Sequence, residues 1–144
     1  MPLDALCLTA VAGEVRAAVQ GGKIDKIYQP TRDEVVLYIR GPAGNVRLLL
    51  SANPGHPRAH LTERNRENPE QPPMFCMLLR KHLQGARILE LNQPPLERIL
   101  DFRLEPLDEL GDRVERRLVL EAMGRSANLL LRDGEGRIVD CTRR

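Results

Sequence analysis

Aromatic residues are the scarcest feature of this 144-residue sequence, which holds two Phe, two Tyr and no Trp. The core must therefore rest on Leu, Ile, Val and Ala, and a hydrophobic content of 42% suits one folded domain over residues 1–144. No apolar run approaches the roughly 18 residues that a membrane-spanning helix requires, so no membrane is expected as a partner. The N-terminus has no basic segment followed by an apolar one, and no secretory signal peptide is predicted.

Cysteine is also rare, with three widely separated residues: Cys7, Cys76 and Cys141. Their odd number and the lack of a C-x-x-C pair argue against a disulfide framework and a zinc site, and favour a reducing cytoplasm. His56 and His60 have a helical metal-binding spacing, but Pro54 and Pro57 exclude a regular helix there. No glycine-rich nucleotide-binding motif is present, so neither a metal nor a cofactor is predicted.

The charge is nearly balanced, at +2, but 19 of the 22 basic residues are Arg and only three are Lys. Arg binds phosphate and carboxylate groups with a planar fork of donors. A GC-rich genome gives the same excess and is the simpler explanation, so charge alone does not identify a nucleic-acid-binding protein.

Residues 4–20 are predicted to form a helix, because Leu8, Val11, Val15 and Val19 fall on one stripe. Asp4 stands at the N-cap, and Gly21-Gly22 ends the helix. The period then becomes extended, which predicts strands at 23–30, 34–40, 46–51 and 58–61.

A second helix is predicted from Pro73 to Gly85 in "PPMFCMLLRKHLQG". Phe75, Leu79 and Leu83 share a face, and the neighbouring Cys76 and Met77 are expected in the core. Arg80, Lys81 and His82 lie in the last turns, where cations suit the negative end of the helix dipole.

Five short segments of alternating polarity follow, separated by turn residues, at 86–93, 97–105, 115–122, 125–133 and 137–142. The sum is an α+β fold, an antiparallel β-sandwich with two helices. The sequence stops on a strand, which suggests a truncated fragment of a longer protein.

Two short motifs are candidates for chemistry. Removal of Met1 would expose the secondary amine of Pro2, a possible Schiff-base nucleophile of the kind found in formamidopyrimidine-DNA glycosylases. Those enzymes place a glutamate next, whereas this sequence has Leu3, which cannot transfer a proton. The pair Glu97-Arg98, after Pro94-Pro95, stands at the mouth of a strand and can present one acceptor and one donor to a ligand, or form an ordinary exposed strand edge.

Five motifs together resemble a known family: "GGKIDKIYQP" (21–30), "LLLSANPGHPRAHLT" (48–62), "NPEQPPMFCMLLRKHLQGARI" (68–88), "DELGD" (108–112) and "MGRSANLLL" (123–131). They resemble the NFACT-N region of the NFACT family, to which bacterial RqcH, also called fibronectin-binding protein A, and eukaryotic NEMF belong. The resemblance implies a noncatalytic N-terminal module of a ribosome quality-control factor, similar in fold to the N-terminal domain of formamidopyrimidine-DNA glycosylases.

The family's partners follow from the same resemblance. They are the large (50S) ribosomal subunit with peptidyl-tRNA, and tRNA, in bacteria alanine tRNA for alanine tailing of stalled chains in the cytoplasm. The resemblance places tRNA-binding residues at Asp4, Glu97 and Arg98. Glu97 replaces the family's Asp, which keeps the charge but moves it by one methylene. Ser126 stands where the family commonly has His, while Asn128 is retained.

Arg80, Lys81 and His82 form a further possible RNA-facing patch in this reading. Two alternatives compete with it. A surface adhesin that binds fibronectin would need export, and a glycosylase-like enzyme is disfavoured by Leu3.

Overall fold

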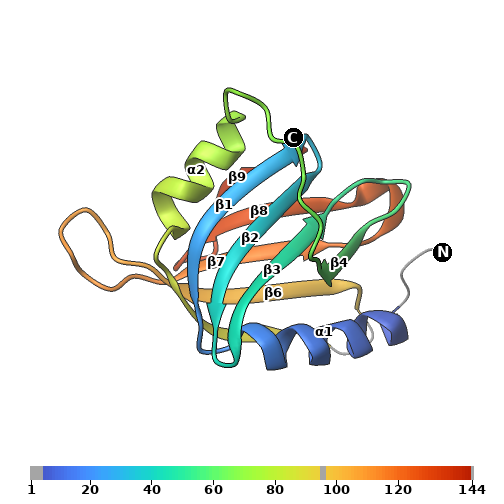
Figure 1. Ribbon diagram of the computed structural model, residues 1–144, viewed down its shortest axis with the longest axis horizontal. Helices are drawn as coiled ribbons and strands as arrows, with labels where there is room; N and C mark the ends of the chain where they lie inside the picture. The colour runs from blue at the N-terminus through green and yellow to red at the C-terminus, as the bar shows by residue number, and fades with distance from the viewer. Residues whose placement is uncertain (1–4, 95–96, 144) are drawn as a thin grey trace.

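The protein is represented by a computed structural model that describes residues 5–94 and 97–143 (Figure 1). The helices are α1 (Ala5–Val19) and α2 (Met74–Leu83). The strands are β1 (Lys23–Thr31), β2 (Glu34–Gly41), β3 (Gly44–Ser51), β4 (Arg58–Leu61), β5 (Arg87–Asn92), β6 (Ile99–Glu105), β7 (Arg116–Glu121), β8 (Asn128–Asp133) and β9 (Ile138–Cys141), with a 3₁₀ turn η1 (Gly124–Ser126) before β8. The prediction of an α+β fold with antiparallel strands and two helices is confirmed.

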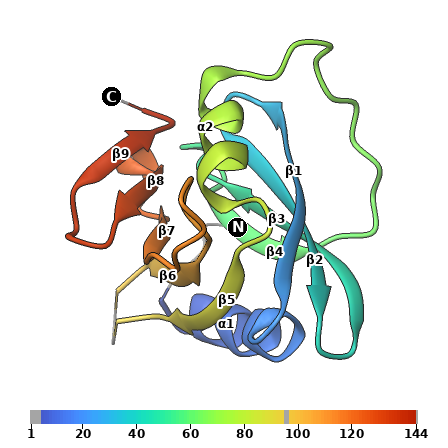
Figure 2. The same cartoon turned by 90° about the vertical axis from the view of Figure 1, so that its left-hand side faces the viewer.

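The strands form one sheet in the order β4-β3-β2-β1-β5-β6-β7-β8-β9, and every neighbouring pair is antiparallel. The join between β1 and β5 is short, with Lys23 opposite Arg87 as its single register pair. Beyond this join the two strands diverge, and β1–β4 and β5–β9 form two layers (Figure 2). The predicted sandwich thus consists of a single hydrogen-bonded sheet that bends back on itself.

The core lies between the two layers and is closed by the helices. Helix α1 buries Leu8, Ala12, Val15 and Val19, with Val11 only partly buried beside them. Phe102 and many Leu and Ile side chains from both layers fill the space between. Full burial of each such side chain stabilises the fold by about 1.5–3 kcal/mol.

Helix α2 fills the opening where β1 leaves β5. Two of its side chains donate to the Ile27 carbonyl oxygen: Arg80 Nε at 2.8 Å and Cys76 Sγ at 3.7 Å. Both donors bond to the edge of β1 at a point where no neighbouring strand pairs with it. Burial raises the pKa of the Cys76 thiol, so Cys76 is a neutral core residue.

The expectation that the "MFCMLL" face of this helix lies in the core is wrong for Met77 and also for Met74, which is 68% exposed. Phe75, Cys76, Leu79 and Leu83 are buried, whereas Met77 is 52% exposed. The buried face is narrower than predicted because α2 packs on the edge of β1 and not on a full sheet face.

Candidate nucleic-acid interface

The Glu97-Arg98 pair lies immediately before β6, where the backbone is held on both sides. The Glu97 N–H donates to the Pro94 carbonyl oxygen at 3.1 Å, and Gln93 Nε2 donates to the Glu97 carbonyl oxygen at 3.1 Å. The Ala122 N–H donates to the Arg98 carbonyl oxygen at 2.8 Å. Strand β6 therefore begins two residues later than predicted, because this backbone turns back on the preceding loop.

The side chains of this pair are left available. Glu97 is exposed and Arg98 is half-buried. Within the described part of the chain, neither side chain makes a hydrogen bond or an ion pair. The local geometry is a firmly held backbone that presents one free carboxylate and one free guanidinium.

The sheet register brings the "MGRSANLLL" motif to the same end of the second layer. Ile99 lies opposite Glu121, and Glu121 lies opposite Asn128. The amide oxygen of Asn128 accepts hydrogen bonds from Thr142 Oγ1 at 2.9 Å and from the N–H of Arg143 at 3.0 Å. Its Nδ2 donates to the Arg143 carbonyl oxygen at 2.8 Å, so Asn128 pins the chain that follows β9.

The three basic residues of α2 do not form one patch. Arg80 faces β1, with its guanidinium 5.4 Å from the centre of the Tyr28 ring. Lys81 Nζ lies 4.0 Å from Glu109 Oε1 on the other side, where Lys81 and His82 line a groove with the loop after β6. Successive helical residues point about 100° apart, which explains the division.

The groove beside Lys81 and His82 favours the neutral form of the His82 side chain. Burial lowers the pKa of His82, and the charges of Arg116 and Lys81 add to the effect while Glu109 opposes it. The groove lies at the far end of β6 from Glu97-Arg98. Seven strand residues separate them, roughly 20 Å.

Asp4, the third predicted tRNA-binding residue, lies outside the described residues, as do Met1 and Pro2. No group of three or more His, Cys, Asp or Glu side chains that could hold a metal ion occurs in the part of the chain that the structure describes. Neither described helix is long and apolar enough to cross a membrane.

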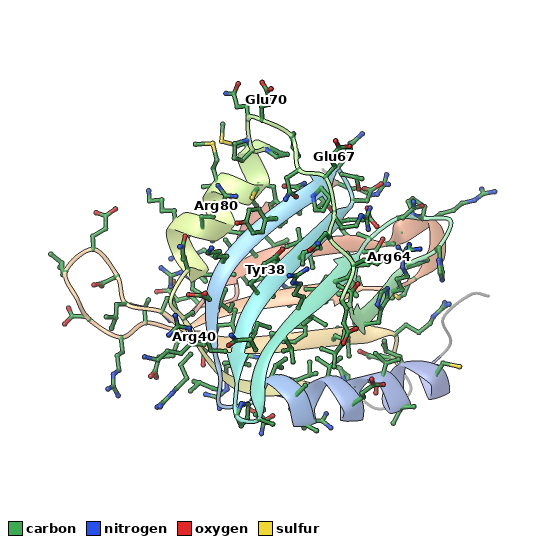
Figure 3. The ribbon with its side chains drawn as sticks, in the orientation of Figure 1. Tyr38, Arg40, Arg64, Glu67, Glu70 and Arg80 are labelled. Carbon is green, nitrogen blue, oxygen red and sulfur yellow. The ribbon has the colours of Figure 1, made fainter. Side chains whose placement is uncertain are left out.

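Sequence reasoning missed a set of planar side chains on the outer face of the first layer. The Tyr28 and Tyr38 rings meet edge to face at 5.1 Å, and the Arg47 guanidinium lies 4.8 Å from the centre of the Tyr38 ring. Figure 3 shows Tyr38 and Arg40 on β2, with Arg80 approaching from α2. The alternation of positions 26, 28, 38, 40 and 47 was the available signal.

The bent nine-stranded sheet with its two helices belongs to a defined class of protein. Residues 4–144 match the family of NFACT N-terminal and middle domains, and the chain is a member of that family. It is 40% identical over 139 residues to the Rqc2 homolog RqcH of Bacillus subtilis (strain 168), an alignment that covers 96% of this chain and 24% of that protein.

Other relatives agree with this membership. The Ribosome quality control complex subunit NEMF of Homo sapiens is 28% identical over 136 residues, which is 94% of this chain and 12% of that protein. The solved N-terminal domain of fibronectin-binding protein PavA from Streptococcus pneumoniae superposes with a TM-score of 0.95 at 39% identity, covering 98% of this chain and 54% of that one. The chain thus spans about a quarter of the length of its bacterial RqcH relatives.

Proposed function

We propose that this chain is the RNA- and ribosome-facing N-terminal region of a ribosome quality-control factor. Membership of the NFACT family and the names of the RqcH and NEMF relatives support it. In this proposal the protein acts in the cytoplasm on a large ribosomal subunit that holds peptidyl-tRNA, and it recruits alanine tRNA. The ribosome itself forms the peptide bonds of the tail, so this chain contributes binding and no catalysis.

The single observation that carries the proposal is the free Glu97-Arg98 pair on its fixed backbone. A carboxylate facing RNA accepts from a base amino group or a 2′-hydroxyl, and a guanidinium contacts phosphate or stacks on a base. The neighbouring Asn128 keeps the adjacent strand end in place. Asp4 is proposed as a further tRNA contact from family resemblance alone, and the likeness to the glycosylase N-terminal domain likewise stays a prediction.

The double substitution Glu97→Ala/Arg98→Ala is expected to weaken tRNA binding about thirtyfold. This corresponds to about 2 kcal/mol for the loss of charged hydrogen bonds. The measurement is tRNA affinity and co-sedimentation with 50S subunits, both at one fixed salt concentration, because phosphate contacts are salt-dependent.

The matched control is Glu135→Ala/Arg137→Ala. It removes an exposed acid and an exposed base that pair at 2.6 Å in the β8–β9 turn, away from Glu97. The control is expected to bind tRNA as the wild type does. Equal tRNA affinity for both double variants would show that Glu97-Arg98 is an ordinary strand edge.

Fibronectin binding is the second candidate function, because solved relatives carry that name. Immobilised fibronectin tests it directly. The adhesin would be favoured over the quality-control factor by two results together. The wild type and the Glu97→Ala/Arg98→Ala variant would both bind fibronectin, and the wild type would not bind tRNA.

A further inference from the structure

The outer face of β1, β2 and β3 carries a ladder of planar side chains. Lys26 lies opposite Tyr38, and Tyr38 lies opposite Arg47, so these three side chains share one face. The order of contacts along the ladder is Arg80, Tyr28, Tyr38, Arg47. Two guanidinium planes thus bracket two aromatic rings on the side of the sheet that faces away from the core.

A row of cations crosses the strands beside this ladder. Lys23 lies between Arg40 on β2 and Arg87 on β5, and all three are exposed. Like charges directly opposite each other on a sheet are destabilising, so the row favours an external anion. Asp25 lies 3.8 Å from Arg40 in an exposed pair, which neutralises little, and neither Lys23 nor Arg87 makes an ion pair with any residue in 5–94 or 97–143.

A groove of about 640 Å³ opens next to the ladder and the row. Tyr38, Arg40, Asn45, Arg47 and Thr62 are among its lining residues. Its volume lies in the range of small-ligand sites and leaves room for a nucleobase beside Arg47. Arg47 Nη1 donates a hydrogen bond to Asn65 Oδ1 at 2.5 Å, which restrains the guanidinium beside the groove.

We propose that this face binds single-stranded RNA. The phosphates contact the row of Arg40, Lys23 and Arg87, and an unpaired base stacks on the Arg47 guanidinium at the end of the ladder. Single strands expose their bases to arginine and aromatic planes, whereas a duplex hides them, so the ladder selects the unpaired form. An acidic peptide would use the cations but would gain nothing from the planar groups.

This face is separate from the Glu97-Arg98 pair. Arg87 lies opposite Glu105 at the last residue of β6, while Glu97 precedes the first. About 20 Å of strand therefore separates the two sites, and the inference goes beyond the proposed contact with tRNA.

The test is fluorescence anisotropy of the protein with a labelled oligouridine of about twelve nucleotides, compared with an RNA duplex of the same length. The wild type is expected to prefer the single strand. Arg47→Lys keeps the charge and can still donate to Asn65, but it removes the plane. It is expected to lower affinity for the single strand about tenfold, with the salt dependence unchanged.

The cation row is tested with Lys23→Gln/Arg87→Gln. Loss of two phosphate contacts is expected to reduce the slope of log affinity against log salt by about 1.4, at about 0.7 per contact on a single strand. The control Arg125→Gln/Arg137→Gln removes two exposed arginines away from the row and is expected to change the slope by less than half as much. Glu97→Ala/Arg98→Ala is expected to bind the oligouridine normally, which separates this face from the proposed tRNA contact.

Three outcomes would overturn the inference: equal affinity of the wild type for duplex and single strand, an Arg47→Lys variant that binds as the wild type does, or equal slopes for the two Gln variants. Thermal melts of each variant confirm that it is folded. Preferential binding of a polyglutamate peptide over the oligouridine would also overturn it and assign the row to a protein partner.

Discussion

The substitution Gly41→Ala is expected to lower the free energy of unfolding by about 3 kcal/mol, among the largest effects of any single methyl group in this chain. Gly41 ends β2 where the last turns of α1 cross it. An ideal Cβ on Gly41 would overlap the carbonyl oxygen of Ala18 and lie 3.1 Å from the carbonyl oxygen of Gly44. Both neighbours are backbone atoms, so relief requires that α1 move away from the sheet.

Gly22, which precedes β1, also lies too close to neighbouring backbone atoms to accept a side chain. A Cβ there would lie 2.5 Å from the carbonyl oxygen of Arg40 and 3.1 Å from the Cα of Gly41. The two glycines therefore set the distance between α1 and the strands that carry Arg40 and Lys23. The substitution at Gly41 is therefore expected to disturb the positions of Arg40 and Lys23 as well as the packing of the core.

The control for this prediction is Gly13→Ala, inside α1, where a Cβ meets nothing within 4 Å. Replacing a helical Gly by Ala is expected to raise stability by about 1 kcal/mol. Urea denaturation of the three proteins measures both effects. Gly41→Ala and Gly13→Ala variants of equal stability would show that α1 does not rest on these glycines.

The order and type of the elements could be predicted from the sequence because periodicity and turn residues agree along the chain. The stripe from Leu8 to Val19 and the Gly21-Gly22 stop correspond to α1, and the short segment at 58–61 corresponds to β4. The bend of the sheet could not be predicted. It depends on β1 and β5 meeting at one register pair, a non-local contact that no local pattern encodes.

The faces of α2 were mispredicted for the same reason. The helix packs on a strand edge, which leaves Met77 exposed and turns Arg80 inward, away from Lys81. Tyr28 and Tyr38 were missed because alternation within each strand does not give the pairing between strands, which sets Tyr38 opposite Lys26. The register shift between Ile24 and Lys26 also brings Lys23 to the same face as Lys26, which alternation does not predict.

Glu34→Gln is expected to destabilise the chain by about 3 kcal/mol. The Glu34 side chain is only 10% exposed and accepts hydrogen bonds from Arg66 Nη2 at 2.6 Å and Arg58 Nη2 at 3.1 Å. A neutral amide would leave two guanidinium groups without their counterion, and breaking such a buried pair from one side costs about 3–5 kcal/mol. The partly exposed arginines favour the lower end of that range.

The pH dependence of this effect has a definite sign. Burial alone would raise the pKa of Glu34, but hydrogen bonds from Arg66 and Thr31 and the charges of Arg66 and Arg58 outweigh it and hold the pKa below the ordinary 4.5. A lowered carboxylate pKa stabilises the fold fully above the unfolded value and loses this contribution as the pH falls through the folded value. The difference in stability between the wild type and Glu34→Gln is therefore constant above about pH 5 and shrinks below pH 4.5.

Urea denaturation from pH 7 to pH 3 measures this difference, with Glu63→Gln as the control. Glu63 is exposed in the segment that follows β4, and its substitution is expected to change stability by no more than about 0.5 kcal/mol. A difference in stability between the wild type and Glu34→Gln that does not change with pH would contradict an ionised Glu34 paired with Arg58 and Arg66. The hydrogen bond from Arg66 to Glu34 also anchors the segment that contains Asn65. Asn65 in turn accepts the hydrogen bond from the Arg47 guanidinium on which the base is proposed to stack. Glu34→Gln is thus expected to weaken oligouridine binding at pH 7 in protein that is still folded, whereas Glu70→Gln, at an exposed position before α2, leaves it unchanged. Glu63 lines the groove, so its substitution is a control for stability alone.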